Sequence, residues 1–289
     1  MAALWRVHTP QGERLARGPA ASGPKELLAP DLGVDDLLRG EASLAGLDEL
    51  PAHGTLTSDA SVLAPLGGQD VWAAGVTYLR SRDARLEESD QLDAYDRVYD
   101  AERPEIFFKA AADRVRGPGE PVGVRSDSEW DVPEPELGVV ADATGSIVAY
   151  VIGNDVSSRS IEGENPLYLP QAKVYTGSCA IGPCLVPLAE APPWYELEIS
   201  LRVNRDGRAV FDDTVQVREL KRSPQELVSW LFAGMDFPVG VVLLTGTAIV
   251  PPSGFTLSPG DEVRIAIHGL GALENPVEQV GTTRERVRP

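Results

Sequence analysis

The sequence predicts a β-rich α+β fold with a small α/β unit at its N-terminus. Gly and Pro contribute 28 and 24 of the 289 residues and are spread along the chain, which favours many short strands and turns over long helices. Several pairs of apolar segments flank turn residues, as β-hairpins do. The length allows one large domain with a smaller one, and it suffices for a substantial core.

Residues 1–70 are expected to form the small N-terminal domain, and residues 71–289 the main domain. In the first we expect a hairpin of Leu4–His8 and Glu13–Ala16, helices at Lys25–Leu28 and Val34–Ala42, and a loop at Pro51–Leu66. In the second we expect a strand at Asp70–Gly75, an amphipathic helix over 79–100 and a strand at Glu105–Lys109. Two hairpins follow, Leu137–Ala141 with Ser146–Ile152 and Glu196–Val203 with Ala209–Val217. The last expected elements are a helix at Pro224–Leu231 capped by Ser223 and strands at Val241–Thr245 and Glu262–Ile267.

The charge balance excludes some partners. The formal net charge is −18 and the isoelectric point about 4.6, so we expect no nucleic acid partner and no anionic membrane surface. Most of the acidic residues are expected to be solvated surface.

The sequence also bears on location and on the scarce residue types. There is no leader pattern and no apolar run of about 18 residues, so a cytoplasmic location is expected. Three histidines are too few for a multi-histidine zinc site. Cys179 and Cys184 are expected to be buried, reduced thiols.

Two carboxylates in one short segment are the most informative feature. Pro133 and Pro135 disfavour helix around Glu134. In an extended chain Glu134 and Glu136 point to the same face, since side chains alternate with a period of two. Like charges in this position repel each other unless a cation lies between them.

The next strand brings a third carboxylate to the same place. If the hairpin pairs symmetrically about Thr144, position 134 lies opposite Asn154 and next to Asp155. Three carboxylates with open positions suit Mg²⁺, and also Mn²⁺ or Ca²⁺. A solvated edge strand is the alternative reading of these residues.

An ordered set of motifs resembles the fumarylacetoacetate hydrolase superfamily. The motifs lie at residues 133–137, 153–159, 173, 182–183, 245–247, 257–261 and 271–277. The resemblance covers about residues 72–280 and implies a mixed β fold, a catalytic domain over residues 71–289 and a homodimer. It also implies metal ligands at Glu134, Glu136 and Asp155, a site lysine at Lys173, and a Thr245-Gly246-Thr247 turn that meets the substrate carboxylate.

Residues 75–78, 99–109 and 161–173 resemble most the branch of 2-keto-3-deoxy-D-arabinonate dehydratase. Many hydrolases of the superfamily carry a His-Glu pair near residues 75–90, where this chain has no histidine. The resemblance therefore implies chemistry that needs only metal, lysine and carboxylates.

Other polar residues have both a functional and an ordinary interpretation. Glu162 and Glu164 fit a general acid or base, or a supporting partner, and equally fit polar loop positions. Lys109 fits a substrate contact or a solvated lysine at a strand end. The remaining candidates for substrate binding are Thr77, Tyr78, Ser81, Arg82 and Arg85 in a lid, Arg159 as a carboxylate clamp or an ion-pair partner of Asp155, and Gln171.

The leading hypothesis is a Mg²⁺-dependent lyase that dehydrates a 2-keto-3-deoxy sugar acid to a 2-oxo acid semialdehyde. The substrate is then a small anionic 2-oxo acid, and the metal stabilises an enolate formed at C3. Lys173 assists proton transfer, and Glu164 or a lid residue protonates the leaving hydroxyl. The alternatives are a hydrolase, decarboxylase or tautomerase of acylpyruvate-like diketo acids, and an inactive ligand-binding homologue.

Overall fold

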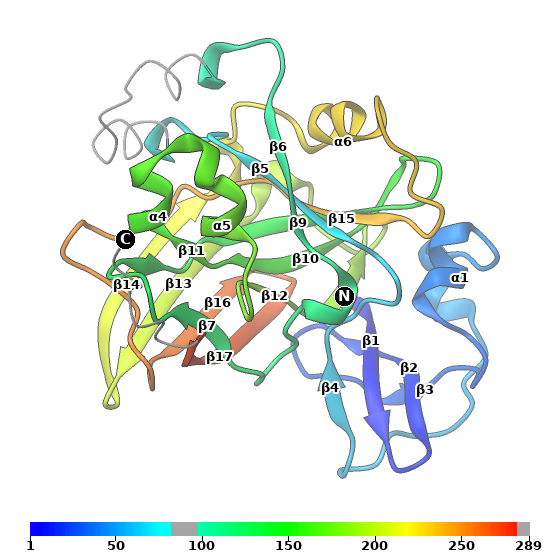
Figure 1. The fold of residues 1–289 in the computed structure, drawn as a ribbon. Coiled ribbons are helices and arrows are strands. Elements are labelled where there is room, and N and C mark those ends of the chain that lie inside the picture. The colour runs from blue at the N-terminus through cyan, green and yellow to red at the C-terminus, as the bar shows by residue number, and fades with distance from the viewer. Residues whose placement is uncertain (82–97, 282–289) are drawn as a thin grey trace.

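A computed structural model describes residues 1–81 and 98–281, and shows two packed β-sheets with short helices at their edges (Figure 1). The larger sheet has ten strands. Across the sheet they are β3 (Glu26–Leu27), β2 (Gly12–Pro19), β1 (Ala2–Thr9), β12 (Cys179–Pro187), β10 (Ile147–Asp155), β9 (Pro135–Ala141), β15 (Val241–Leu244), β5 (Val71–Gly75) and β6 (Glu105–Ala110), and β4 (Ser61–Leu63) pairs with β1.

The smaller sheet has five strands and packs against one face of the larger. They are β14 (Arg208–Gln216), β13 (Glu198–Arg205), β16 (Glu262–Ile267), β17 (Gly271–Val280) and β7 (Val122–Arg125). A separate two-stranded ladder joins β8 (Asp131–Val132) to β11 (Ser157–Ser158).

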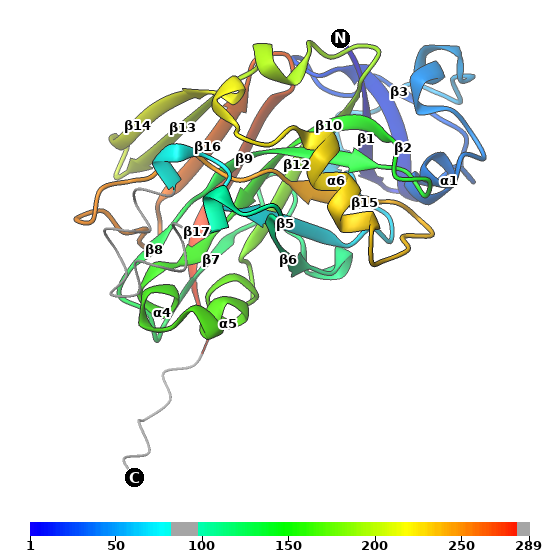
Figure 2. The ribbon, with the colours of Figure 1, turned by 90° about the horizontal axis from the view of Figure 1, so that it is seen from above.

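The helices that lie wholly within the described residues are α1 (Val34–Arg39), α4 (Arg159–Glu164), α5 (Leu169–Lys173) and α6 (Pro224–Phe232), with 3₁₀ turns at Leu44–Glu49, Ala112–Arg114, Pro166–Tyr168, Trp194–Glu196 and Val217–Glu219. Figures 1 and 2 show α4 and α5 side by side at one end of the molecule and α1 at the other. No helix in the described part of the chain has the length and apolar run that a membrane span needs.

Alternating side chains divide the core between the two faces of the larger sheet. Val139 and Ile152 face the smaller sheet, where they pack with residues such as Leu201 and Ile265. Val140 and its neighbours on the opposite face pack with the helical N-terminal segments. This two-sided burial explains why β9 and β10 are apolar throughout their lengths.

Strand direction determines where functional residues meet. Strand β15 is parallel to β5 and antiparallel to β9, and β10 and β6 are antiparallel to β9 and β5 respectively. The C-terminal ends of β5, β10 and β15 therefore lie at the same edge as the starts of β6 and β9. Residues that are far apart in sequence converge at this edge.

Most of the predicted elements are confirmed. The N-terminal hairpin, α1, β5, β6, both later hairpins and α6 occur where expected, and Ser223 Oγ accepts a hydrogen bond from the Glu226 amide at 3.1 Å as the predicted N-cap. Cys179 and Cys184 are free and buried, as expected.

Other predicted elements differ from the structure. The helix expected at Lys25–Leu28 is wrong, because Glu26 and Leu27 pair with β2 as strand β3. Strand β17 was missed, and the expected loop at 51–66 contains β4. Most of the helical segment expected at 79–100 lies outside the described residues.

The N-terminal strands are joined to the main sheet. Strand β1 pairs with β12, with Leu4 opposite Leu185. Sheet pairing thus crosses the domain boundary expected near residue 70, and that boundary stays a prediction.

The packing between the sheets gives a test of stability. Leu201 in β13 is fully buried, whereas Val210 in the edge strand β14 is 44% exposed. We expect Leu201→Ala to lower the free energy of unfolding by about 2–5 kcal/mol, because it leaves a cavity between the sheets. Val210→Ala should change it by less than about 0.5 kcal/mol. Urea denaturation measures both, and equal losses would contradict this account of the core.

Candidate metal centre and active site

Three buried carboxylates meet at the strand edge described above. Glu134 directly precedes β9, Glu136 lies within it, and Asp155 ends β10. One oxygen of each lies within 4.8 Å of the others, and all three residues are at most 3% exposed. The predicted convergence is therefore confirmed, and the alternative of a solvated edge strand is wrong because β9 lies between β10 and β15.

A register shift improves this convergence. The ladder between β9 and β10 shifts between Ile147 and Ala149, so that Gly153 pairs with Glu136. The Asp155 amide then donates to the Glu134 carbonyl at 2.9 Å. Asp155 thus lies opposite Glu134, one residue from the arrangement that symmetric pairing predicts.

Lys173 supplies positive charge at the centre of the cluster. Its Nζ donates to Glu134 Oε2 at 2.6 Å, to Asp155 Oδ2 at 3.1 Å and to Ser157 Oγ at 2.6 Å. Lys173 itself is 2% exposed. The ammonium therefore bridges two of the three carboxylates from the end of α5.

Arg159 is also buried, at the start of α4. Its Nη2 lies 2.8 Å from Glu134 Oε1, and its Nη1 lies 3.7 Å from Glu162 Oε2. The ion pair expected with Asp155 is formed with Glu134 instead. Glu162, 4% exposed, belongs to the same buried group.

Lys109 contacts the cluster without lining the cavity. It is fully buried and forms an ion pair with Asp155 Oδ1. Its Nζ also donates to the Val156 carbonyl at 3.0 Å and to the Lys173 carbonyl at 2.5 Å. The alternative of a solvated strand-end lysine is therefore wrong.

The Thr245-Gly246-Thr247 turn follows β15 and closes the site on the third side. The Gly246 amide donates to Glu136 Oε2 at 2.6 Å, and Thr77 Oγ1 donates to the Thr245 carbonyl at 2.7 Å. Gly246 has φ +95°, and a Cβ there would lie 1.9 Å from Thr77 Oγ1. The turn therefore requires glycine at this position.

The three carboxylates differ in their electrostatics. Burial, followed by the charges of Asp155 and Glu134, raises the pKa of Glu136 well above its ordinary value. Burial also acts on Asp155, but Lys109 and Lys173 outweigh it and lower the pKa of Asp155. Glu136 is thus the carboxylate that the protein's own cations compensate least.

The donor set fits a hard divalent cation. Five carboxylates line the cavity (Glu105, Glu134, Glu136, Asp155 and Glu162), together with Lys173 and Arg159. Lys109 adds a third positive charge behind it. If all are ionised, a divalent ion balances the remaining negative charge. No histidine or cysteine is among the described lining residues, and such an all-oxygen site is typical of Mg²⁺.

Two of the lining residues that were not predicted as site residues bear on the chemistry of the site, one through its charge and one through its ring. Glu105 starts β6 opposite Gly75, where a Cβ would lie 2.2 Å from Glu105 Oε2. Phe107 lies two residues further on, with its ring 5.6 Å from Lys173 Nζ. The signal that could have found both is the strand pairing of β5 with β6.

The structure does not bring every predicted residue to the cavity. Glu164 and Gln171 are exposed on the helical segments and do not line it. Tyr78 is buried against Leu220 and Ala248. Among the expected lid residues, Ser81 lines the cavity, whereas Arg82 and Arg85 lie outside the described residues.

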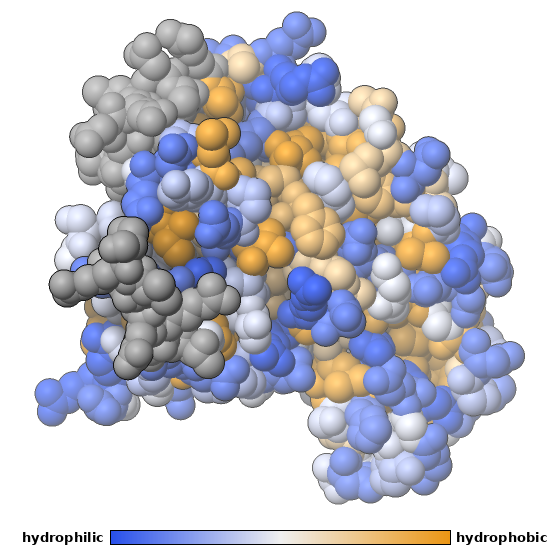
Figure 3. Space-filling model, in the orientation of Figure 1, coloured by the Kyte–Doolittle hydropathy of each residue, from blue (hydrophilic) through white to orange (hydrophobic). Residues whose placement is uncertain are grey.

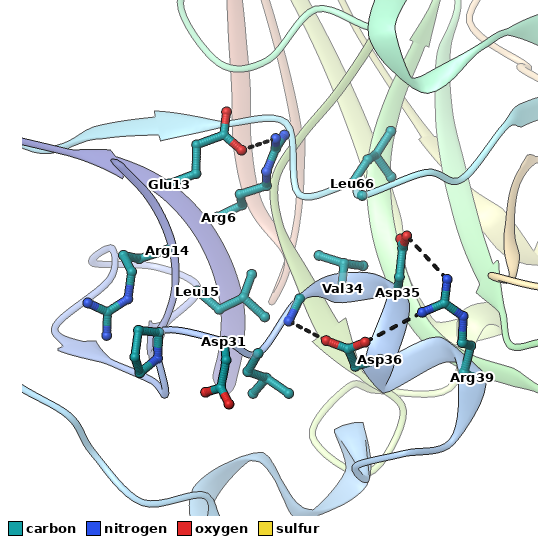
Figure 4. Close-up of a pocket in the computed structure, with 14 residues that line it drawn as sticks. Arg6, Glu13, Arg14, Leu15, Asp31, Val34, Asp35, Asp36, Arg39 and Leu66 are labelled. Carbon is teal, nitrogen blue, oxygen red and sulfur yellow. Dashed lines mark hydrogen bonds and ion pairs between the residues drawn. The ribbon is translucent and has the colours of Figure 1, made fainter. Parts of the chain in front are cut away.

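A second hollow, in the N-terminal region, has a different character (Figure 4). Its charged residues largely pair with one another: Arg6 binds Glu13, and Arg39 lies 3.8 Å from Asp35 and 3.5 Å from Asp36. Because these charges pair with one another, the carboxylate cluster at the strand edge is the stronger candidate site.

Figure 3 shows how hydropathy is distributed over one face of the molecule, with apolar residues toward the middle of the view.

Residues 71–278 match the family described as "Fumarylacetoacetate (FAA) hydrolase C-terminal". The chain is 48% identical over 284 residues to the "Probable 2-keto-3-deoxyxylonate dehydratase" of Haloferax volcanii, covering 93% of this chain and 97% of that protein. It is 43% identical over 226 residues to the "2-dehydro-3-deoxy-D-arabinonate dehydratase" of Saccharolobus solfataricus, covering 77% and 76% respectively.

A solved structure is similar over almost the whole chain. It is the "2-keto-3-deoxy-D-arabinonate dehydratase complexed with magnesium and 2,5-dioxopentanoate", with a TM-score of 0.83 and 35% identity. The match covers 98% of this chain and all of that one.

The raised pKa of Glu136 predicts how pH affects the stability of the metal-free protein. The folded state holds a proton that the unfolded chain releases above the ordinary value of 4.5. The thermal midpoint should therefore fall as pH rises from 4.5 through the raised pKa, and saturating Mg²⁺ should reduce this fall. Thermal unfolding in chelator and in Mg²⁺ across this pH range measures both effects.

The control for this prediction is Glu136→Gln, which should flatten the slope in chelator. Burial raises the pKa of Asp131 to about 6, which gives a slope of the same sign, so only the difference between the two proteins reports on Glu136. Identical slopes would show that Glu136 is not the group responsible.

Proposed function

The chain belongs to the fumarylacetoacetate hydrolase family, and from this premise we propose that it is a Mg²⁺-dependent dehydratase of a 2-keto-3-deoxy sugar acid. The observation that carries the proposal is the buried group of Glu134, Glu136 and Asp155 with Lys173 at its centre. The names of the two relatives and the magnesium complex of the similar structure support it.

The metal would be held by Glu134, Glu136 and Asp155. When bound, Mg²⁺ supplies a Lewis acid that polarises the keto group and stabilises negative charge formed next to it. Residues of the chain bind the substrate, orient it and transfer the protons.

The substrate is a small 2-oxo acid anion, and its carboxylate needs donors. Gly246 and Thr247 line the cavity, whereas the Thr245 hydroxyl donates to the Leu137 carbonyl and so supports the turn. Lys173 and Arg159 line the same cavity and provide positive charge. Phe107 and Leu169 add an apolar wall that limits the entry of water.

Dehydration breaks the C3–H and C4–O bonds and releases water, and the unsaturated 5-hydroxy product becomes the aldehyde, by way of its enol, when a proton leaves C5 and another is added at C3. We assign acceptance of the C3 proton to the Lys173 amine, whose nitrogen lies inside the cavity and must first lose one ammonium proton to solvent. We assign protonation of the departing hydroxyl to Glu162 in its carboxylic acid form, because it is buried and lines the cavity, whereas Glu164 is exposed and does not. Arg159 would hold Glu162 in place.

A product analysis tests the proposal. The purified protein with Mg²⁺ should convert a 2-keto-3-deoxypentonate to an aldehyde-containing 2-oxo acid, and an excess of chelator should stop the reaction. Cleavage of an acylpyruvate into two acids would favour the hydrolase alternative. Failure to turn over either substrate class, together with no Mg²⁺-induced rise in the thermal midpoint, would favour an inactive homologue.

Substitution of the ligands should separate chemistry from folding. We expect Glu134→Gln and Asp155→Asn to lower kcat by about 100-fold or more, since the developing charge loses its stabilisation. Circular dichroism should stay unchanged. The matched control is Glu274→Gln, which removes a carboxylate that pairs with Arg264 on the exposed surface. Full activity of either ligand variant would contradict the metal site.

The homodimer implied by the family and the cytoplasmic location stay predictions. Sedimentation analysis of the purified protein tests the first, and cell fractionation tests the second.

A further inference from the structure

Each of the three carboxylates gives one oxygen to a fixed donor of the protein. Glu134 Oε1 lies 2.8 Å from Arg159 Nη2, and Glu136 Oε2 accepts from the Gly246 amide at 2.6 Å. Asp155 Oδ1 pairs with Lys109. The second oxygen of Glu134 and that of Asp155 both face Lys173 inside the cavity.

Lys109 is the most strongly fixed of these donors. It is 0% exposed, and two backbone carbonyls accept hydrogen bonds from its Nζ beside the Asp155 contact. One of these carbonyls belongs to Lys173, so the same ammonium also ties down the end of α5. Asp155 cannot turn its Oδ1 into the cavity without leaving the buried Lys109 charge unpaired, which is costly.

The number of carboxylate oxygens that can bind the ion discriminates between cations. Ca²⁺ takes about six to eight oxygens at long, flexible distances and often binds both oxygens of one carboxylate. Mg²⁺ requires near-octahedral geometry at about 2.0–2.1 Å and keeps several waters. A site that presents single carboxylate oxygens therefore favours the smaller ion.

We propose that Lys109 is a positioning residue that selects Mg²⁺ over Ca²⁺ by holding Asp155 Oδ1, so that a cation can bind only Oδ2, in place of the Lys173 ammonium that now donates to it at 3.1 Å. Arg159 and the Gly246 amide restrict Glu134 and Glu136 in the same way. This inference rests on the proposed metal site, and it gives Lys109 a function in metal selectivity in place of substrate contact.

Calorimetric titration of the chelator-treated protein with MgCl₂ and with CaCl₂ tests the proposal without an activity assay. The wild type should bind Mg²⁺ at least as tightly as Ca²⁺. Lys109→Met keeps an unbranched apolar chain but frees Asp155 Oδ1, and it should shift the ratio of the two affinities toward Ca²⁺ by about tenfold. An unchanged ratio in folded Lys109→Met would overturn the proposal.

The matched control is Arg205→Met. Arg205 pairs with the fully buried Asp261 at 2.7 and 2.8 Å but does not line the cavity. It should lose stability without a change in the affinity ratio. A shift as large as that of Lys109→Met would show a general effect of lost buried ion pairs and would overturn the proposal.

Two outcomes separate this inference from the proposed function. If the wild type binds no Mg²⁺, the metal site itself fails, and the selectivity proposal fails with it. If the wild type binds Mg²⁺ but prefers Ca²⁺ by tenfold or more, only the selectivity proposal fails. A wild type that prefers Ca²⁺ in this way overturns the selectivity proposal even if Lys109→Met does not fold.

Discussion

Repulsion among three desolvated carboxylates is the constraint on which the rest of the site depends. Glu134, Glu136 and Asp155 are almost completely buried within a few ångströms of one another, and buried charges are tolerated only when they are paired. Lys173 and Arg159 face them from α5 and α4, and Lys109 reaches Asp155 from β6. These contacts determine where both short helices and the end of β6 must lie.

The sheet topology makes this concentration of charge possible. A carboxylate pair spaced by two residues on β9 faces one side, and the antiparallel β10 returns Asp155 to the same place. The parallel pairing of β5 with β15 adds the Thr77 and Gly246 segments at the same edge. Because the strands are buried on both faces, the edge is rigid, and small changes in register would separate the ligands.

Local patterns in the sequence were enough to predict the hairpins and the convergence of the three carboxylates, whereas Lys173 was predicted from the resemblance to the family. They could not predict the shift between Ile147 and Ala149 that moves Asp155 opposite Glu134, because a bulge depends on packing against both sheets. They also left Lys109 ambiguous, since alternation along β6 shows which face a residue occupies but not what lies behind it. Glu105 was missed because its pairing with Gly75 joins segments 30 residues apart.

The charge balance of the cavity also reconciles an acidic protein with an anionic substrate. The whole chain carries a formal charge of −18, and the lining carboxylates outnumber the nearby cations. A 2-oxo acid that approached the metal-free cavity would therefore meet net repulsion. A divalent cation cancels the excess and so removes this repulsion, while Lys173 and Arg159 stay in the lining of the cavity beside their carboxylate partners. The anion is therefore expected to bind the loaded site more tightly than the metal-free one, because the cation removes this repulsion.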